Sequence, residues 1–191
     1  HTPSLLQLVD HLIDAEEYEE AGKNLDKVIA VNPAHPEAWA YRAVLAHFNN
    51  DSEQETKARD RALRLWKTNP RVAFLIGQKL SQKYRFIEGS TYQRQAVGWD
   101  ADYLPAKNQL AQDLLRLGED EEGWRLAEEV FKKDGYDVAS YNLVTLHESI
   151  AKFQTVTNRD FIVRMHPAEA AIYGQRVLAL LQRAKAAVCQ K

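Results

Sequence analysis

The chain has 191 residues, 45% hydrophobic and 27% charged, enough for one elongated repeat domain or one and a half globular domains. Its 25 basic and 27 acidic residues nearly cancel, so no global charge attracts nucleic acid or anionic lipid. The one cysteine, Cys189, excludes an intrachain disulfide and a cysteine-based metal site. No run approaches the roughly 18–20 apolar residues of a membrane span, and no signal peptide is recognisable. Because the chain begins at His1 rather than Met, we expect the native N-terminus to be missing, and we make no prediction of the cellular compartment.

The N-terminal part of the chain is predicted to form two helical hairpins. The first pairs a helix over Ser4–Ala15 with one over Glu17–Val31, each with apolar residues at spacings of three or four. The predicted inner faces comprise Leu5, Leu8, Val9, Leu12, Tyr18, Ala21, Leu25 and Val28. Pro33 ends the second helix because its ring cannot donate a hydrogen bond, and Pro36 can open the next helix.

The second hairpin begins with a helix that presents Trp39 and Ala43. Its partner is expected to start at a capping box formed by Ser52 and Glu55. That partner helix should carry Leu65 on its apolar face and end at Asn69-Pro70, as the earlier helix ends at Asn32-Pro33.

Two further hairpins are predicted from Arg71 and from near Leu104, followed by a helix over Val138–Lys152. One small-residue position recurs every 34 residues, at Val9, Ala43, Gly77 and Ala111. These four matches in register resemble the tetratricopeptide (TPR) repeat. The resemblance implies a mostly α fold, a TPR-type α-solenoid of antiparallel helix hairpins, with about four and a half repeats over residues 1–152.

From Phe153 the apolar period changes from that of a helix to two, which predicts two strands joined by a polar turn. Pro167 then opens a long amphipathic helix. We expect a second domain over residues 153–191, a short β-hairpin plus helix that begins a truncated α/β domain. Because an isolated hairpin has open edges, a homodimer through the hairpin edge is a further expectation.

The tail, with its aromatic-led strand, polar turn, DFIVRM segment and proline-initiated helix, resembles the opening of peptidase-MA-like domains that follow TPR arrays in some bacterial proteins. Those domains are gluzincin zinc metallopeptidases, so the resemblance implies zinc ligands beyond Lys191. Within the chain, His147-Glu148 begins an H-E-x-x-H motif, but Ala151 stands where the second histidine is required. We assign no catalytic residue, metal or cofactor, and expect that the chain itself is not an enzyme.

One helix carries a basic stripe that consists of Lys57, Arg61, Arg64 and, more loosely, Lys67. Binding of nucleic acid would require accessible aromatic residues or a domain of high pI beside such a stripe, whereas the sequence pI is about 6.3. We therefore interpret the stripe as a solvated convex face and predict no nucleic-acid partner.

The TPR resemblance also implies a concave groove, lined by the first helix of each hairpin, that binds peptide. Carried across to the first two repeats, the groove positions are Leu6, Asp10, Glu37, Val44 and His47. In the later repeats the candidate peptide-binding residues are Phe74, Gln78, Gln82, Asn108, Gln112 and Asn142. Most of these are amides, which suit hydrogen bonding to a peptide backbone.

Two functions fit the sequence. The first is a non-catalytic TPR scaffold that binds a protein or peptide, or a neighbouring domain of its own chain, through the concave groove. The alternative is the N-terminal part of a zinc metallopeptidase, presenting substrate or anchoring a catalytic domain that lies beyond Lys191. An H-E-x-x-H motif after Lys191 would separate the two.

Overall fold

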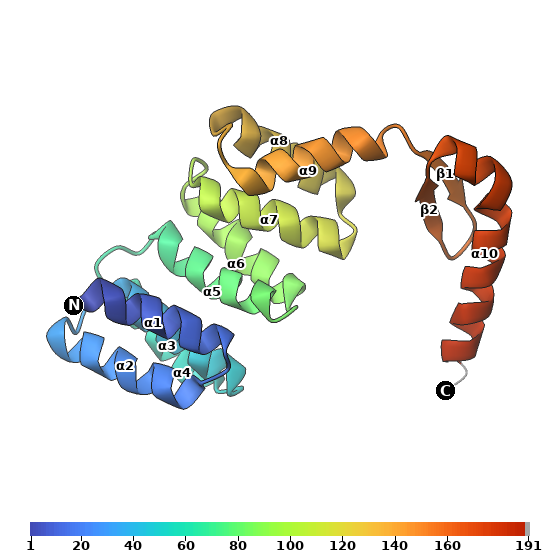
Figure 1. Cartoon of the computed structure of the whole chain (residues 1–191). Helices are drawn as coiled ribbons and strands as arrows, with labels where there is room; N and C mark the ends of the chain where they lie inside the picture. The colour runs from blue at the N-terminus through green and yellow to red at the C-terminus, as the bar shows by residue number, and fades with distance from the viewer. Residues whose placement is uncertain (190–191) are drawn as a thin grey trace. The chain divides into compact units, whose positions relative to one another are not determined.

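The computed structural model describes residues 1–189, which form ten helices and one two-stranded sheet (Figure 1). Helix accounts for 75% of the chain, so the prediction of a mostly α fold is confirmed. The chain divides into two compact units, His1–Ser140 and the segment from Tyr141 onward. The first unit contains α1 (Thr2–Asp14), α2 (Tyr18–Val31), α3 (Pro36–Phe48), α4 (Ser52–Ala62), α5 (Pro70–Gln82), α6 (Phe86–Trp99), α7 (Leu104–Leu117) and α8 (Asp120–Lys133).

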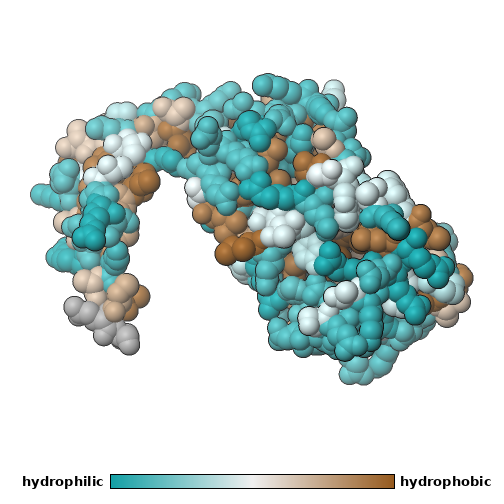
Figure 2. All heavy atoms as spheres, turned by 180° about the vertical axis from the view of Figure 1, so that it is seen from behind, coloured by the Kyte–Doolittle hydropathy of each residue, from teal (hydrophilic) through white to brown (hydrophobic). Residues whose placement is uncertain are grey.

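Successive helices of the first unit pack as hairpins, α1 with α2, α3 with α4, α5 with α6 and α7 with α8. The first helices of neighbouring hairpins also pack on one another, so that α3 contacts both α1 and α5, and α5 contacts α7. This stacking is the predicted α-solenoid. Polar side chains cover most of the face of this unit shown in Figure 2.

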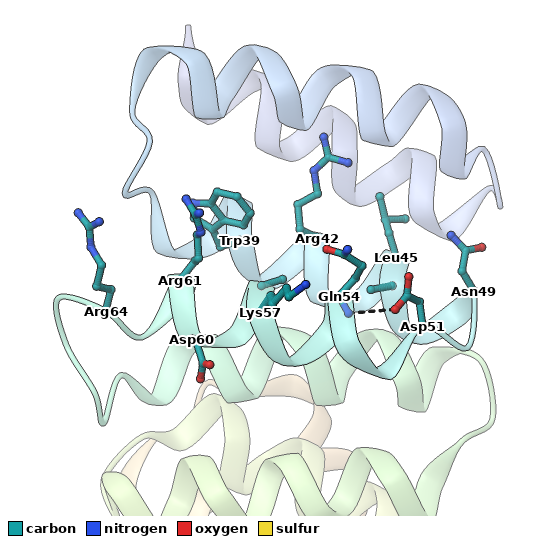
Figure 3. A pocket seen from close by; sticks show the side chains of 12 residues that line it. Trp39, Arg42, Leu45, Asn49, Asp51, Gln54, Lys57, Asp60, Arg61 and Arg64 are labelled. Carbon is teal, nitrogen blue, oxygen red and sulfur yellow. Dashed lines mark hydrogen bonds between the residues drawn. The ribbon is translucent and has the colours of Figure 1, made fainter.

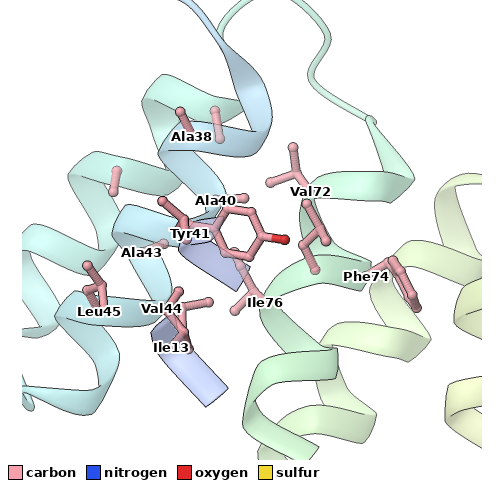
Figure 4. Close-up of a cluster of buried hydrophobic side chains, with 14 of the residues drawn as sticks. Ile13, Ala38, Ala40, Tyr41, Ala43, Val44, Leu45, Val72, Phe74 and Ile76 are labelled. Atoms are coloured by element: carbon pink, nitrogen blue, oxygen red, sulfur yellow. The ribbon is translucent and has the colours of Figure 1, made fainter. Parts of the chain in front are cut away.

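The 34-residue register places the repeated small position in the interior. Val9, Ala43 and Ala111 have no exposed surface, and Gly77 is also buried, which confirms the predicted register. Around Ala43 the side chains of α1, α3 and α5 form one apolar cluster (Figure 4). Small residues at this position let the helices approach closely enough for the larger neighbours to interdigitate.

The inner face of α1 differs from the prediction. Leu6, Val9 and Ile13 are the buried residues, whereas Leu8 is 45% exposed. Leu5 and Leu12 pack only partly against the core. A leucine stands at nearly every candidate position of this helix, so the sequence period alone could not choose the face.

Helix α4 is shorter than predicted and begins at a different cap. Asp51 Oδ1 accepts a hydrogen bond from the Gln54 backbone N–H at 3.0 Å, so Asp51, not Ser52, is the N-cap. The helix ends at Ala62, and Leu65, expected on its apolar face, is 76% exposed. Only Ala58 and Ala62 of α4 are buried, and beyond the helix end Leu63 is only partly buried, so little apolar contact stabilises a further turn.

Pro70 opens α5 instead of closing α4. Asn69 is the N-cap of α5, and its side chain accepts a hydrogen bond from the Arg71 backbone N–H. Proline is well suited to the first helical position because the N–H it lacks would have no partner there. Pro36 opens α3 in the same way.

The second unit contains a β-hairpin and one long helix. Strands β1 (Gln154–Thr157) and β2 (Ile162–Met165) pair antiparallel, with Val156 opposite Val163. The Asn158 side chain closes the turn by accepting hydrogen bonds from the backbone N–H groups of Asp160 and Phe161, both at 2.9 Å. This hairpin packs on α10 (Pro167–Cys189), where Gly174 lies against Val156. Helix α9 (Val138–Ile150) spans the junction of the two units.

In the part of the chain that the structure describes, no helix is both long and apolar enough to cross a bilayer.

Among the helix contacts made through glycine, the one between α5 and α6 leaves the least space for a Cβ atom. A Cβ atom on Gly77 would lie 2.8 Å from the Gly89 carbonyl oxygen and 2.9 Å from Tyr92 Cβ. A Cβ on Gly89 would lie 2.1 Å from Ser81 Oγ. The third hairpin therefore requires the absence of a side chain at both positions.

We expect Gly77→Ala to lower the free energy of unfolding by about 1–3 kcal/mol, because the added methyl group has no space. Gly98→Ala is the matched control, since a Cβ there meets nothing within 4 Å. The control should be neutral or stabilising by up to about 1 kcal/mol through helix propensity. Urea unfolding followed by circular dichroism measures both, and equal effects of the two substitutions would contradict the close-packing argument.

Candidate functional site

The N-terminal part of the predicted groove is occupied by the protein's own side chains. Lys79 on α5 is 1% exposed, and its Nζ lies 2.6 Å from Asp10 Oδ1 and 2.7 Å from Asp14 Oδ1, both on α1. The Tyr41 hydroxyl of α3 donates to the same Asp10 oxygen at 2.9 Å. These contacts hold α1 against α3 and α5 together.

Of the five groove positions of the first two repeats, two are buried and three make contacts within the protein. Val44 is completely buried, and Leu6 is nearly so. Glu37 pairs with Arg71, and His47 Nδ1 lies 3.0 Å from Glu55 Oε2. The sequence predicts Leu6 and Val44 at the groove surface, and the structure places both in the core instead.

Asp10, His11 and Asp14 are one group in the described residues whose donor atoms approach closely enough to surround a metal ion. The Lys79 ammonium already lies against both carboxylates. It supplies the positive charge that a cation would otherwise supply, and a dication would have to displace it. We therefore assign no metal to this cluster.

The third and fourth hairpins retain a cavity of about 530 Å³. Its walls come from α5, α7, the turn before α7, the end of α8 and the segment that follows α8. The lining residues are Phe74, Gln78, Asp102, Tyr103, Leu104, Pro105, Asn108, Gln109, Gln112, Val130, Asp134 and Asp137. We call this space the amide cavity.

Four of the six candidate peptide-binding residues lie in the amide cavity: Phe74, Gln78, Asn108 and Gln112. Gln82 is exposed on α5 and lies outside it. Asn142 is exposed on α9 and belongs to the second unit. The 34-residue register thus brings together the candidates of the third and fourth hairpins.

Aromatic side chains form one wall of the amide cavity. The ring of Phe74 meets that of Tyr103 edge to face, with centroids 5.7 Å apart. Burial raises the pKa of the Tyr103 phenol, so Tyr103 stays a neutral donor and acceptor at physiological pH. This wall offers an apolar surface beside groups that form hydrogen bonds.

Asn108 has a structural role and also carries an unsatisfied hydrogen-bond acceptor. Its Nδ2 donates to Asp137 Oδ1 at 2.8 Å, and the same oxygen accepts from the Ser140 backbone N–H at the start of α9. Because a carboxylate only accepts, Asn108 must present its NH₂ group to Asp137. Its buried Oδ1 has no hydrogen-bond partner among the residues described.

A buried carboxylate lies beneath the amide cavity. Asp113 has no exposed surface, and it accepts hydrogen bonds from Ser81 Oγ at 2.7 Å and from Gln109 Nε2 at 2.9 Å. Burial raises the pKa of Asp113, and the two hydrogen bonds only partly oppose this effect. The Gln109 side chain is in this way oriented from below by an internal group.

Sequence reasoning missed Lys79 and Asp113. Lys79 did carry a signal, because it lies between Ile76 and Leu80 in the otherwise largely apolar run of α5. Asp113 stands between the apolar pairs Leu110-Ala111 and Leu114-Leu115, which gave a similar signal. In both places the partner lies on another hairpin, so the sequence alone could not name it.

The stacked hairpins of the first unit form a TPR-type α-solenoid. No family model matches the sequence, and no curated protein matches it either. Likeness to solved structures therefore carries the comparison.

PilF of Pseudomonas aeruginosa is similar with a TM-score of 0.52 and 17% identity, covering 78% of this chain and 70% of PilF. PilW, a type IV pilus biogenesis factor, gives a TM-score of 0.51 at 14% identity, covering 78% of this chain and 71% of PilW. MamA gives a TM-score of 0.51 at 13% identity, covering 74% of this chain and 82% of MamA. At these identities the likeness is one of fold.

We expect Asp113→Asn to stabilise the protein at neutral pH, by about 1 kcal/mol, because it removes a buried charge while keeping the hydrogen-bond partners. A raised pKa in the folded state means that stability is fully present below the ordinary aspartate pKa and is lost as pH rises through the folded value. The difference between variant and wild type should therefore grow upward from about pH 4.

Thermal unfolding at a series of pH values measures this difference. Asp60→Asn, at an exposed position of α4, is the control and should show no such growth. A constant difference between Asp113→Asn and wild type from pH 4 to pH 7 would contradict the raised pKa.

Proposed function

We propose that this chain is a non-catalytic TPR scaffold that binds an extended segment of a protein or peptide in the amide cavity. The observation that carries the proposal is the convergence of Phe74, Gln78, Asn108 and Gln112 on one cavity. Gln109 adds a further amide to the same lining. A set of amides beside aromatic rings matches a peptide backbone, which offers alternating donors and acceptors and apolar side chains.

The charges at the rim of the amide cavity favour a backbone ligand over a charged one. Asp102 pairs with Lys133, and Asp134 accepts from the Tyr136 backbone N–H within the turn after α8. Asp137 is held by Asn108 and Ser140. Only Asp102 has a cationic partner among the described residues, so Asp134 and Asp137 keep their negative charge and disfavour an anionic ligand, while the neutral amides remain to bind a backbone.

We expect the double variant Gln78→Ala/Gln112→Ala to weaken peptide binding by about 30-fold, because each lost hydrogen bond contributes about 1 kcal/mol. Both side chains are half-buried, so their removal should spare the fold. Ligands selected from a random peptide library with the wild type are compared by fluorescence anisotropy.

Gln82→Ala is the matched control, since Gln82 is a candidate amide outside the amide cavity. It should leave affinity unchanged. Asn108→Ala is unsuitable because it also removes the bond to Asp137. Equal binding of the selected peptides by the double variant and the wild type would refute the assignment.

The alternative, a substrate-presenting or anchoring part of a zinc metallopeptidase, is supported by the second unit. Large apolar side chains are exposed on its hairpin and helix, among them Ile162, Ile172, Leu180 and Val188. Such a surface suits packing against additional protein. We therefore retain residues 153–191 as the start of a further α/β domain, and an H-E-x-x-H motif encoded after Lys191 would favour this alternative.

We also propose that the outer edge of β1 pairs with β1 of a second copy. Asn158 N–H donates to Phe161 O at the turn, and hydrogen-bonded pairs alternate from there, so Thr155 directs its N–H away from β2. An open edge of this kind recruits another strand, and pairing of equivalent edges gives a closed dimer.

Thr155→Pro should abolish this dimer while leaving the hairpin's own hydrogen bonds, because proline removes only the outward N–H. Sedimentation velocity across a concentration series measures the dimer fraction, and Thr155→Ser is the conservative control. A wild type that stays monomeric, or a dimer that persists in Thr155→Pro, would exclude the edge pairing.

A further inference from the structure

A second cavity, of about 930 Å³, lies on the opposite side of α3 from the α5 contact. Trp39, Arg42, Ala46 and Asn49 of the α3 segment line it at spacings of three and four, whereas Tyr41 and Val44 point into the core. Figure 3 shows Trp39 next to Arg61 of α4 and the Arg42 side chain pointing away from α4. This surface is therefore separate from the amide cavity.

The cavity continues toward α2. A neighbouring depression of about 480 Å³ is lined by α2 and shares Arg42, Leu45 and Asn49 with the first. Together the two form a trough that has α3 as its floor and α2 and α4 as its sides. We call it the α2–α4 trough.

The floor of the α2–α4 trough is apolar and held in place. Leu45 and Ala46 of α3 form the floor, and Ala58 of α4 adjoins it. Trp39 stands at one end, and its indole Nε1 donates to the Pro33 carbonyl at 2.8 Å, which fixes the ring. An apolar side chain of a partner would find a preformed contact surface there.

The α4 side of the trough is cationic. Lys57, Arg61 and Arg64 follow one another at spacings of four and three, and all three line the cavity. Arg61 lies over the Trp39 ring at 5.1 Å from its centroid. Arg61 and Arg64 have no carboxylate partner among the described residues, whereas Lys57 pairs with Glu53 and Arg42 with Asp26.

The two carboxylates of the lining do not cancel this charge. Asp51 caps α4 through the Gln54 N–H and is thereby engaged, which leaves Asp60 beside the cationic side chains. The chain as a whole has a net charge of −2, so the cationic rim is a local concentration of positive charge. The basic stripe interpreted from sequence as a solvated face is thus the edge of a cavity.

We propose that the α2–α4 trough is a docking surface for an acidic segment of a partner protein. Carboxylates of that segment pair with Arg61 and Arg64, and its apolar side chains lie on Leu45, Ala46 and Ala58. Charge complementarity selects this occupant. The site is independent of the amide cavity, so one chain can hold two partners at once.

RNA fits the same charges less well. The Trp39 face is covered by Arg61, so it offers no open stacking platform to a base. On the opposite side of the trough, Glu19 and Asp26 pair with Lys23 and Arg42. Of the cations described in the lining, those without a carboxylate partner are therefore confined to Arg61 and Arg64 and do not form the extended track that a phosphate backbone needs. An acidic peptide places its charges only where the arginines are.

The probe is a fluorescein-labelled helical peptide of about twelve residues, built of glutamate and of leucine at helical spacing. A second peptide has glutamine at every glutamate position, and a labelled oligouridine of similar length represents RNA. Anisotropy titrations at low and high salt measure binding. We expect the glutamate peptide to bind and the glutamine peptide to bind at least about tenfold more weakly, with salt removing most of the difference.

Two variants locate the binding. Arg61→Glu/Arg64→Glu should weaken binding of the glutamate peptide at least about tenfold. Lys132→Glu/Arg183→Glu changes the net charge equally at exposed positions that do not line the trough and should have no effect. Ala46→Phe fills the floor without changing charge and should also weaken binding of the glutamate peptide. This variant tests the site even if the charge reversal unfolds the chain.

The proposal is overturned if both peptides bind equally, if neither binds, or if the control variant weakens binding as much as the charge reversal. Tighter binding of oligouridine than of the glutamate peptide would assign the trough to nucleic acid instead. Unchanged binding by Ala46→Phe would show that the peptide lies elsewhere.

Discussion

The arrangement of the first three hairpins depends on one buried cation. The Lys79 ammonium is almost entirely removed from water, which is costly unless it is paired, and Asp10 and Asp14 both approach within hydrogen-bonding distance. Those partners lie on α1, whereas Lys79 lies on α5. The need to neutralise one charge therefore draws the first hairpin across the second and onto the third.

Two separate cavities lie on the solenoid. Asp10, Tyr41 and Lys79 fill the space between α1, α3 and α5, and one cavity lies at the third and fourth hairpins. On the other side of α3, the α2–α4 trough opens where α4 is short. The lining of the amide cavity carries amides and aspartates, whereas the lining of the trough carries four cationic side chains, so the two surfaces differ in charge.

Sequence reasoning predicted the parts of the fold that repeat. The 34-residue register, the hairpin order and the strand-turn-strand tail follow from local periodicity and were correct. What it missed depends on contacts between hairpins. The end of α4 depends on how much of that helix α3 can bury. The packing of α1 depends in part on Lys79, which lies 69 residues from its partner Asp10. Four candidate site residues came together because they share the register. The positions of Gln109 and Asp113 could be recognised only in the folded structure.

The Lys79 contact also sets the order in which the chain can assemble. In most solenoids each repeat contacts only its neighbours, so structure can grow from the N-terminus as the chain is synthesised. Here the charged partner of the first hairpin lies on α5, more than sixty residues further along the chain. Until that helix is present, Asp10 and Asp14 stay solvated, and a non-local closure must follow. The first hairpin thus precedes α5 in the chain, yet its ion pairs with the third hairpin form only after α5 has been made.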